Sequence, residues 1–180
     1  MKAILIVDHG SRRAEANEML TCVANLVQAM TGPDVIVRPA HMELAEPSIP
    51  TAFSSCVEAG ATEVVVFPYM LSPGKHSTGD IPRMVSAAAA AYPEVAFSVT
   101  PAFGVNEKLG EIILARAGIE LSAAFAESDP NRCWDPACSE KLCGDACRAR
   151  LLAIDLPPRP PRVTNGFVSS DFGGLGGLGG

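Results

Sequence analysis

The chain has few basic residues: its 180 amino acids include 14 Lys and Arg against 20 Asp and Glu, and the formal net charge is −6. Nucleic-acid grooves and anionic membrane surfaces both attract proteins through an excess of Lys and Arg. The charge balance therefore argues against nucleic acid or a membrane surface as a main partner. Only a local basic patch stays compatible with it.

The sequence also lacks an apolar run of the length that spans a bilayer. Residues 2–7 already have a strand pattern, so we expect no signal or transit peptide within this numbering, although a removed targeting segment stays open. With 48% hydrophobic residues, the chain is long enough for one domain with a core and an appendage. We expect a soluble, intracellular protein.

Strand patterns alternate with helical patterns over the first two thirds of the chain. Strands are expected at 2–7, 35–40, 63–68 and 94–99, and helices at 13–30, 47–59, 79–92 and 106–117. The apolar face expected for the first helix consists of Met19, Leu20, Val23, Leu26, Val27 and Met30. This alternation predicts an α/β fold with a four-stranded parallel sheet and helices on both faces.

The composition changes after about residue 118. Four of the six cysteines lie in 119–150, residues 156–162 are rich in proline, and the chain ends in Gly-Gly-Leu repeats. We expect an α/β domain at 1–118, an irregular Cys-rich segment at 119–150, and a tail at 151–180 without stable structure. So small an α/β unit would leave a shallow site, which a homodimer would enlarge.

Histidine is scarce as well, with three in the chain, and two of them hold equivalent places. His9 and His76 each follow a strand pattern and a turn, where open α/β sheets place their chemistry. Glu43 follows the second strand and is expected at the same edge. Two imidazoles and one carboxylate predict an open metal or proton-transfer site. The alternative is that both histidines only hydrogen-bond to loop backbone.

Groups that bind anions accompany the two histidines in the sequence. Backbone N–H groups at a helix start, a hydroxyl, two guanidinium groups and an ammonium group together suit a polycarboxylate ligand. For any single cation, ordinary solubility at a helix start is the alternative. The candidate binding residues are Gly10, Ser11, Arg12, Arg13 and Lys75.

A second strong pattern consists of four cysteines within fifteen residues: Cys133, Cys138, Cys143 and Cys147. Their spacing allows them to converge on one metal centre. Disulfides are disfavoured because Cys22 and Cys56 lie on core helix patterns, where we interpret them as small core residues, and because the fold is expected inside the cell. Zinc sites more often have paired CxxC knuckles, which are absent, so iron–sulfur ligation is preferred over zinc.

Three segments resemble the signatures of the short class II tetrapyrrole chelatases, the sirohydrochlorin chelatase group. They are Asp8-His9-Gly10-Ser11, residues 42–49, and residues 71–76 with Asp80-Ile81-Pro82. The resemblance covers about residues 1–118 and includes spacing as well as residue type. It implies a homodimer of flavodoxin-like half-domains that inserts a divalent metal into a modified tetrapyrrole with His9, His76 and Glu43.

The activity that the resemblance implies is insertion of Fe²⁺ into sirohydrochlorin to form siroheme. Two pyrrole protons must leave while the metal loses its waters, and imidazole can both accept protons and hold a metal loosely. The carboxylates of the substrate would give Arg12, Arg13 and Lys75 a role. Insertion of cobalt or nickel stays an alternative, as does a non-catalytic carrier of tetrapyrrole or iron with a redox-sensing cluster.

The plant and algal branch of these ferrochelatases carries a similar C-terminal cysteine cluster, which implies an Fe–S cluster and a setting in the plastid stroma. We expect [2Fe–2S], although the spacing does not separate it from [4Fe–4S], and structural zinc is the other alternative. Because metal insertion is not a redox reaction, sensing or stapling of the dimer ranks above iron delivery. His41 departs from the resemblance, which predicts an apolar residue before Met42, and we interpret it as structural.

Overall fold

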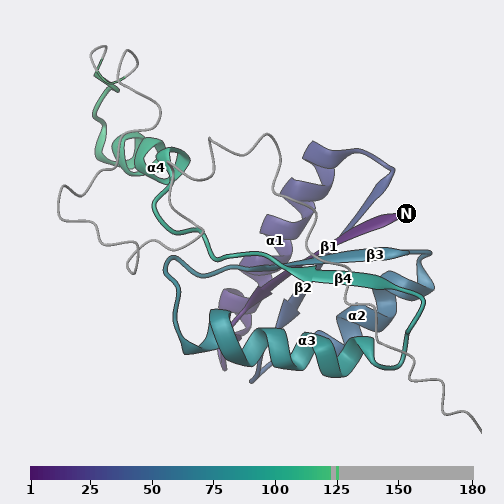
Figure 1. Cartoon of the computed structure of the whole chain (residues 1–180). Coiled ribbons are helices and arrows are strands. Elements are labelled where there is room, and N and C mark those ends of the chain that lie inside the picture. The colour runs from purple at the N-terminus through teal and green to yellow at the C-terminus, as the bar shows by residue number, and fades with distance from the viewer. Residues whose placement is uncertain (123–124, 126–180) are drawn as a thin grey trace, which may run out of the picture.

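The computed structural model describes residues 1–122 and 125 (Figure 1). Most of the predicted Cys-rich segment 119–150 lies outside the described residues, as does the whole of the predicted tail 151–180. The four candidate cluster ligands Cys133, Cys138, Cys143 and Cys147 also lie outside them. The predictions for these parts of the chain therefore stay predictions.

Four strands form one parallel sheet in the order β2-β1-β3-β4 (Figure 1). They are β1 (Lys2–Asp8), β2 (Val35–His41), β3 (Glu63–Pro68) and β4 (Ala96–Val99). β1 pairs along its whole length with β2, and it pairs with β3 on its other side. Because all four strands run the same way, the segments that follow them lie along one edge of the sheet. The predicted four-stranded parallel α/β fold is confirmed.

Helices cover both faces of this sheet (Figure 1). α1 (Ala14–Thr31) lies on one face, and α2 (Ile49–Glu58) and α3 (Ile81–Ala89) lie on the other. The larger core lies under α2 and α3 around Phe53 and Leu5, and a smaller one lies under α1 around Leu20 and Ile6. Adjacent residues of β1 thus pack into the cores on opposite faces of the sheet, because successive side chains of a pleated strand point to opposite faces. None of the helices in the described residues is long and apolar enough to cross a membrane.

α1 buries a narrower face than the sequence predicts. Leu20 is buried and Val23 and Val27 are partly buried, whereas Met19, Leu26 and Met30 are 67%, 61% and 76% exposed. The reason is that α1 packs mainly on β2, with no second helix beside it among the described elements to cover its flank. Three of the six residues on the predicted apolar face are therefore exposed in the structure.

The two cysteines in the described residues differ in burial. Cys56 on α2 is buried, and this desolvation raises the pKa of its thiol to about 11. Cys22 on α1 is exposed. The core interpretation is confirmed for Cys56 and wrong for Cys22.

The third predicted helix begins earlier than expected, with a π-helical turn at His76–Asp80 that continues into α3. His76 therefore stands at the start of a helix and not in a loop. The hydroxyl groups of Ser77 and Thr78 donate to the carbonyl oxygen of Gly74, which ties this turn to the segment before it. Single π turns of this kind often occur at functional sites.

α4 (Glu107–Ala117) extends away from the sheet and has no buried residue (Figure 1). Its predicted start is confirmed, because Asn106 Oδ1 accepts a hydrogen bond from the Lys108 N–H at 2.9 Å. The loop before it is tied to the loop after β3 by hydrogen bonds from the N–H groups of Phe103 and Gly104. The chain therefore leaves the sheet at the edge where the strands end. Contrary to the prediction, α4 does not cover a face of the sheet.

Candidate active site

His9 and Glu43 meet at the edge of the sheet where β1 and β2 end. His9 Nε2 lies 2.9 Å from Glu43 Oε1, and the side chains are 45% and 53% exposed. Beyond the strands, the Met42 N–H donates to the Asp8 carbonyl at 2.9 Å and the Glu43 N–H donates to the His9 carbonyl at 3.1 Å. The parallel pairing of β1 and β2 thus continues into the two loops and brings the imidazole to the carboxylate.

His76 completes the group from the other side of β1. Its ring stands edge-on to that of His9, with ring centroids 5.2 Å apart and an angle of 74° between the planes. His76 Nδ1 lies 3.0 Å from Asp80 Oδ2. Because an ionised carboxylate only accepts hydrogen bonds, Nδ1 carries the proton, and the lone pair of Nε2 is left for a metal or a proton. The predicted residues His9, Glu43 and His76 are brought together.

Asp80 is a site residue that the sequence analysis missed. The hydrogen bond from His76 lowers the pKa of its carboxyl group, and the nearby charge of Lys75 lowers it further. Asp80 is therefore a carboxylate at neutral pH and can orient the imidazole. The spacing of four residues between His76 and Asp80 was the available signal, since it places both on one helical turn.

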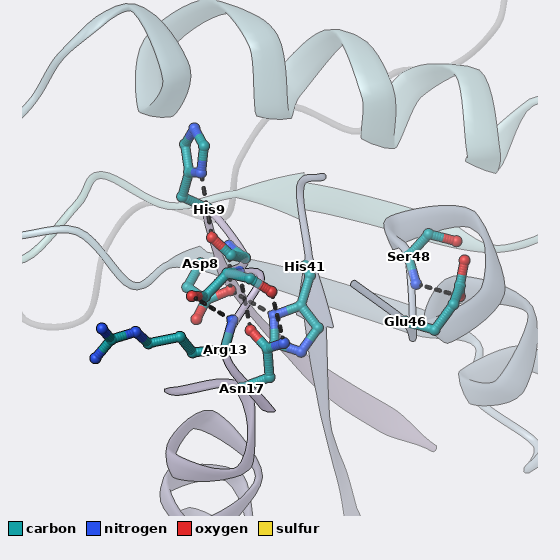
Figure 2. A network of polar contacts seen from close by, with 9 residues as sticks. Asp8, His9, Arg13, Asn17, His41, Glu46 and Ser48 are labelled. Carbon is teal, nitrogen blue, oxygen red and sulfur yellow. Dashed lines mark hydrogen bonds and ion pairs between the residues drawn. The ribbon is translucent and has the colours of Figure 1, made fainter. Parts of the chain in front are cut away.

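The loop after His9 satisfies its own backbone donors. The N–H groups of Gly10, Ser11 and Arg13 donate to Asp8 Oδ1, Asn17 Oδ1 and Ser11 Oγ, at 2.9, 2.9 and 3.1 Å (Figure 2). Asn17 Nδ2 in turn donates to the Ser11 carbonyl. These backbone groups are therefore not available to an anion, contrary to the sequence-based expectation for the helix start.

The predicted cations, in contrast, are exposed. Arg12, Arg13 and Lys75 are all exposed, and in the described part of the chain none of them forms an ion pair with a carboxylate. Figure 2 shows the Arg13 side chain directed away from the hydrogen-bonded loop. An anionic ligand at this edge of the sheet would therefore be bound by these side chains and not by backbone N–H groups.

The imidazole and carboxylate groups are arranged as two pairs, His9 with Glu43 and His76 with Asp80. Over residues 1–122 and 125, no group of three or more His, Cys, Asp or Glu side chains is arranged to hold a metal ion. The expected set of two imidazoles and one carboxylate is therefore present as neighbouring pairs and not as a closed ligand cage. Such an open arrangement suits brief contact with a metal and exchange of protons.

Exposed apolar side chains lie in the loops that follow the same strand ends, and they were not among the predicted site residues. Leu44, Tyr69, Leu71 and Val105 are 52%, 38%, 70% and 47% exposed. Each follows the end of β2, β3 or β4, and the Tyr69 N–H donates to the Val7 carbonyl directly before the loop of His9. The same edge therefore offers both polar pairs and apolar surface, which a large flat ligand with charged substituents would need.

A family model described as CbiX matches residues 3–119. The chain belongs to the CbiX family. Over 130 residues it is 43% identical to a protein named sirohydrochlorin ferrochelatase, chloroplastic, from Arabidopsis thaliana, a match that covers 72% of this chain and 56% of that protein.

Two solved structures resemble this one. SirB from Bacillus subtilis with Fe³⁺ has a TM-score of 0.59 and 33% identity, covering 64% of this chain and 45% of that chain. The sirohydrochlorin chelatase SirB from Bacillus subtilis subspecies spizizenii in complex with cobalt has a TM-score of 0.61 and 32% identity, covering 65% and 50%. This chain spans about half the length of the Arabidopsis protein and of these two SirB chains.

The resemblance to class II chelatases is thus confirmed, and the part of the chain that matches CbiX contains His9, Glu43 and His76. The roles of these residues, and of the candidate binding residues from Gly10 to Arg13 and Lys75, stay predictions. The structure adds Asp80 beside His76.

Gly10 lies at a position in this CbiX chain where the backbone leaves no room for a side chain. Its φ is +85°, and a methyl group built on it would overlap the carbonyl oxygen of Glu43. We expect Gly10→Ala to lower the free energy of unfolding by more than about 2 kcal/mol, measured by denaturant titration. It should also displace Glu43 from His9.

Gly60→Ala is the matched control, because Gly60 has a similar φ of +93° but nothing within 4 Å of the added methyl group. This control should lower the free energy of unfolding by only about 1–2 kcal/mol, which is the cost of placing a side chain at a positive φ. Equal losses in the two variants would contradict the close approach of Gly10 to the Glu43 carbonyl.

Proposed function

We propose that this chain is a sirohydrochlorin ferrochelatase, which inserts Fe²⁺ into sirohydrochlorin to form siroheme. The observation that carries the proposal is the meeting of His9, Glu43 and His76 at an open edge of the sheet, with each side chain about half exposed. The names of the relatives support the substrate and the metal.

Metal insertion exchanges one divalent ion for two pyrrole protons, and the site has two imidazole–carboxylate pairs to receive them. In the first pair, a proton taken by His9 can pass to Glu43 across 2.9 Å. In the second pair, Asp80 holds the Nδ1 proton of His76, so that Nε2 faces the reaction as a base or as a transient ligand. Because the site offers few ligands, it would hold the ion loosely, and the ion could then be released to the macrocycle.

The surroundings of the pairs fit the substrate. The apolar side chains of Leu44, Tyr69 and Leu71 would contact the flat macrocycle. The exposed guanidinium groups of Arg12 and Arg13 and the ammonium group of Lys75 would bind its carboxylates.

Insertion of cobalt is the second candidate function. One solved relative is described with Fe³⁺ and the other in complex with cobalt. Imidazole and carboxylate accept both divalent ions, so the site residues do not choose between them.

We further propose that Cys133, Cys138, Cys143 and Cys147 hold a [2Fe–2S] cluster and that the protein acts in the plastid stroma. Four closely spaced thiolates are the donor set that such clusters use. The chloroplastic name of the relative from Arabidopsis supports the location.

A homodimer is also part of the proposal, and two uncovered apolar surfaces support it. Met19, Leu26 and Met30 form an exposed stripe on α1, at steps of seven and four residues. α4 exposes Ile112 and Ile113 and contains no buried residue. Exposed apolar side chains that gather along a helix often mark a contact between subunits. We assign the covering partner as a second copy of the chain, because most oligomers of soluble proteins are homo-oligomers and the symmetric dimer is the commonest of them.

The function is tested by an anaerobic assay that follows the visible absorption of sirohydrochlorin with Fe²⁺ and, separately, with Co²⁺. The native chain should turn over many times with Fe²⁺, and His76→Ala should lower kcat about 100-fold or more, because it removes an acid–base group at the reacting atoms. Lys108→Ala is the control, since it removes only an exposed ion pair on α4. Turnover with Co²⁺ alone would favour the second candidate, and no turnover would favour a carrier.

The cluster is tested by the colour of protein purified without oxygen. The native chain should be brown, and a variant with all four cysteines changed to Ser should be colourless yet keep its turnover, because metal insertion transfers no electrons. Cys22→Ser should stay brown, since Cys22 is the exposed thiol of α1. A colourless native chain that contains zinc would contradict the iron–sulfur assignment.

The homodimer is tested by light scattering after size-exclusion chromatography. The native chain should have the mass of two chains, and Leu26→Glu should shift it toward the mass of one, because a buried carboxylate would lack a partner. Asn25→Glu places the same charge next to the stripe and should leave the dimer intact. A native mass of one chain would refute the homodimer.

A further inference from the structure

The third histidine, His41, is the largest buried polar side chain in the described part of the chain, with 1% of its surface exposed. Its Nδ1 lies 2.6 Å from Asp8 Oδ1, at the point where β2 and β1 end side by side (Figure 2). The proposed proton transfers use neither residue. Desolvating such a pair costs free energy, and an apolar pair of similar volume is often equally stable. Stability alone is therefore a weak reason for its presence.

One oxygen atom of Asp8 connects His41 to the active-site loop. Asp8 Oδ1 accepts the hydrogen bond from His41 and also one from the Gly10 N–H, at 2.9 Å. Gly10 directly follows His9 and lies against the carbonyl of Glu43. The backbone N–H of His41 donates to the Pro47 carbonyl at 2.8 Å, which fixes the end of β2 to the loop that continues from Glu43.

We propose that His41 is a positioning residue for metal insertion, acting through Asp8 on the turn that holds His9 against Glu43. The proposal rests on the proposed function. Without the His41 ring, Asp8 Oδ1 loses its shortest hydrogen bond and can leave the Gly10 N–H. The turn then gains freedom, and a shift of about 0.5 Å is enough to impair an arrangement of this kind. His9 is affected directly, whereas Tyr69, Leu71 and Lys75, which would also contact the tetrapyrrole, follow β3 and lie outside this turn.

The test compares His41→Leu with His41→Asn in the anaerobic Fe²⁺ assay, well below the unfolding temperature of each variant. Leu removes the donor, whereas the Asn amide places a donor near the position of Nδ1 and can still bond to Asp8. We expect His41→Leu to lower kcat about 10–100-fold, with KM for the tetrapyrrole changed less than about threefold. His41→Asn should restore kcat to within about threefold of the native value.

Tyr92→Phe is the matched control, because it removes another partly buried side-chain hydrogen bond, 2.9 Å from Tyr92 to Ser54, away from the site. Tyr92→Phe should lower the free energy of unfolding and leave kcat unchanged. If His41→Leu does not fold, Asp8→Asn and Asp8→Ala replace the pair of variants. Asn keeps an oxygen that can accept both hydrogen bonds, so it should retain kcat, whereas Ala should lose it.

A second readout does not depend on turnover. The ring nitrogen resonances of His9, measured by ¹⁵N NMR, should move in His41→Leu and return in His41→Asn. The proposal would be overturned if His41→Leu kept the native kcat and left the His9 resonances unmoved. It would also be overturned if His41→Leu changed both quantities and His41→Asn restored neither. Absence of turnover in the native chain would refute the proposed function instead, and the NMR comparison would still decide the positioning role.

Discussion

The parallel pairing of β1 with β2 on one side and β3 on the other is the constraint on which the site depends. In a parallel sheet every strand ends at the same edge, so residues distant in sequence meet without any contact between their helices. Here the pairing continues past the strands, through the hydrogen bonds from the N–H groups of Met42 and Glu43. The distance between His9 and Glu43 is therefore set by the backbone ladder.

Openness is the second physical property of the site. Each imidazole is about half exposed and has one carboxylate partner within 3.0 Å. A buried cage of three or four ligands would hold a divalent ion tightly and keep it from a macrocycle. Two solvated pairs exchange protons and metal readily, and in this proposal the macrocycle supplies the remaining ligands. Preorganisation then comes from the supports behind the imidazoles, Asp80 for His76 and the Asp8 turn for His9.

The strands and the meeting of His9, Glu43 and His76 were predictable from sequence, because strand patterns are local and a parallel topology forces their ends together. Asp80 was not predicted, because its spacing from His76 has a meaning only on a helix and His76 was expected in a turn. The contact between Asp8 and His41 was not predicted, because it depends on side-chain geometry that no pattern records. The periodicity of α1 marks Met19 and Leu26 as apolar but does not show that the fold leaves them uncovered. For the same reason Cys22 and Cys56, alike in sequence context, differ in burial.

The uncovered helices and the open site have a common consequence. Exclusion of water strengthens the electrostatic interaction between an imidazole and its carboxylate, yet the single chain leaves both pairs half solvated. In the proposed function, a bound macrocycle would cover one side of the pairs. In the proposed dimer, a second copy that packs on α1 would bring another wall toward the loop of His9, because α1 begins five residues after it. Assembly and catalysis are then linked through the same loop.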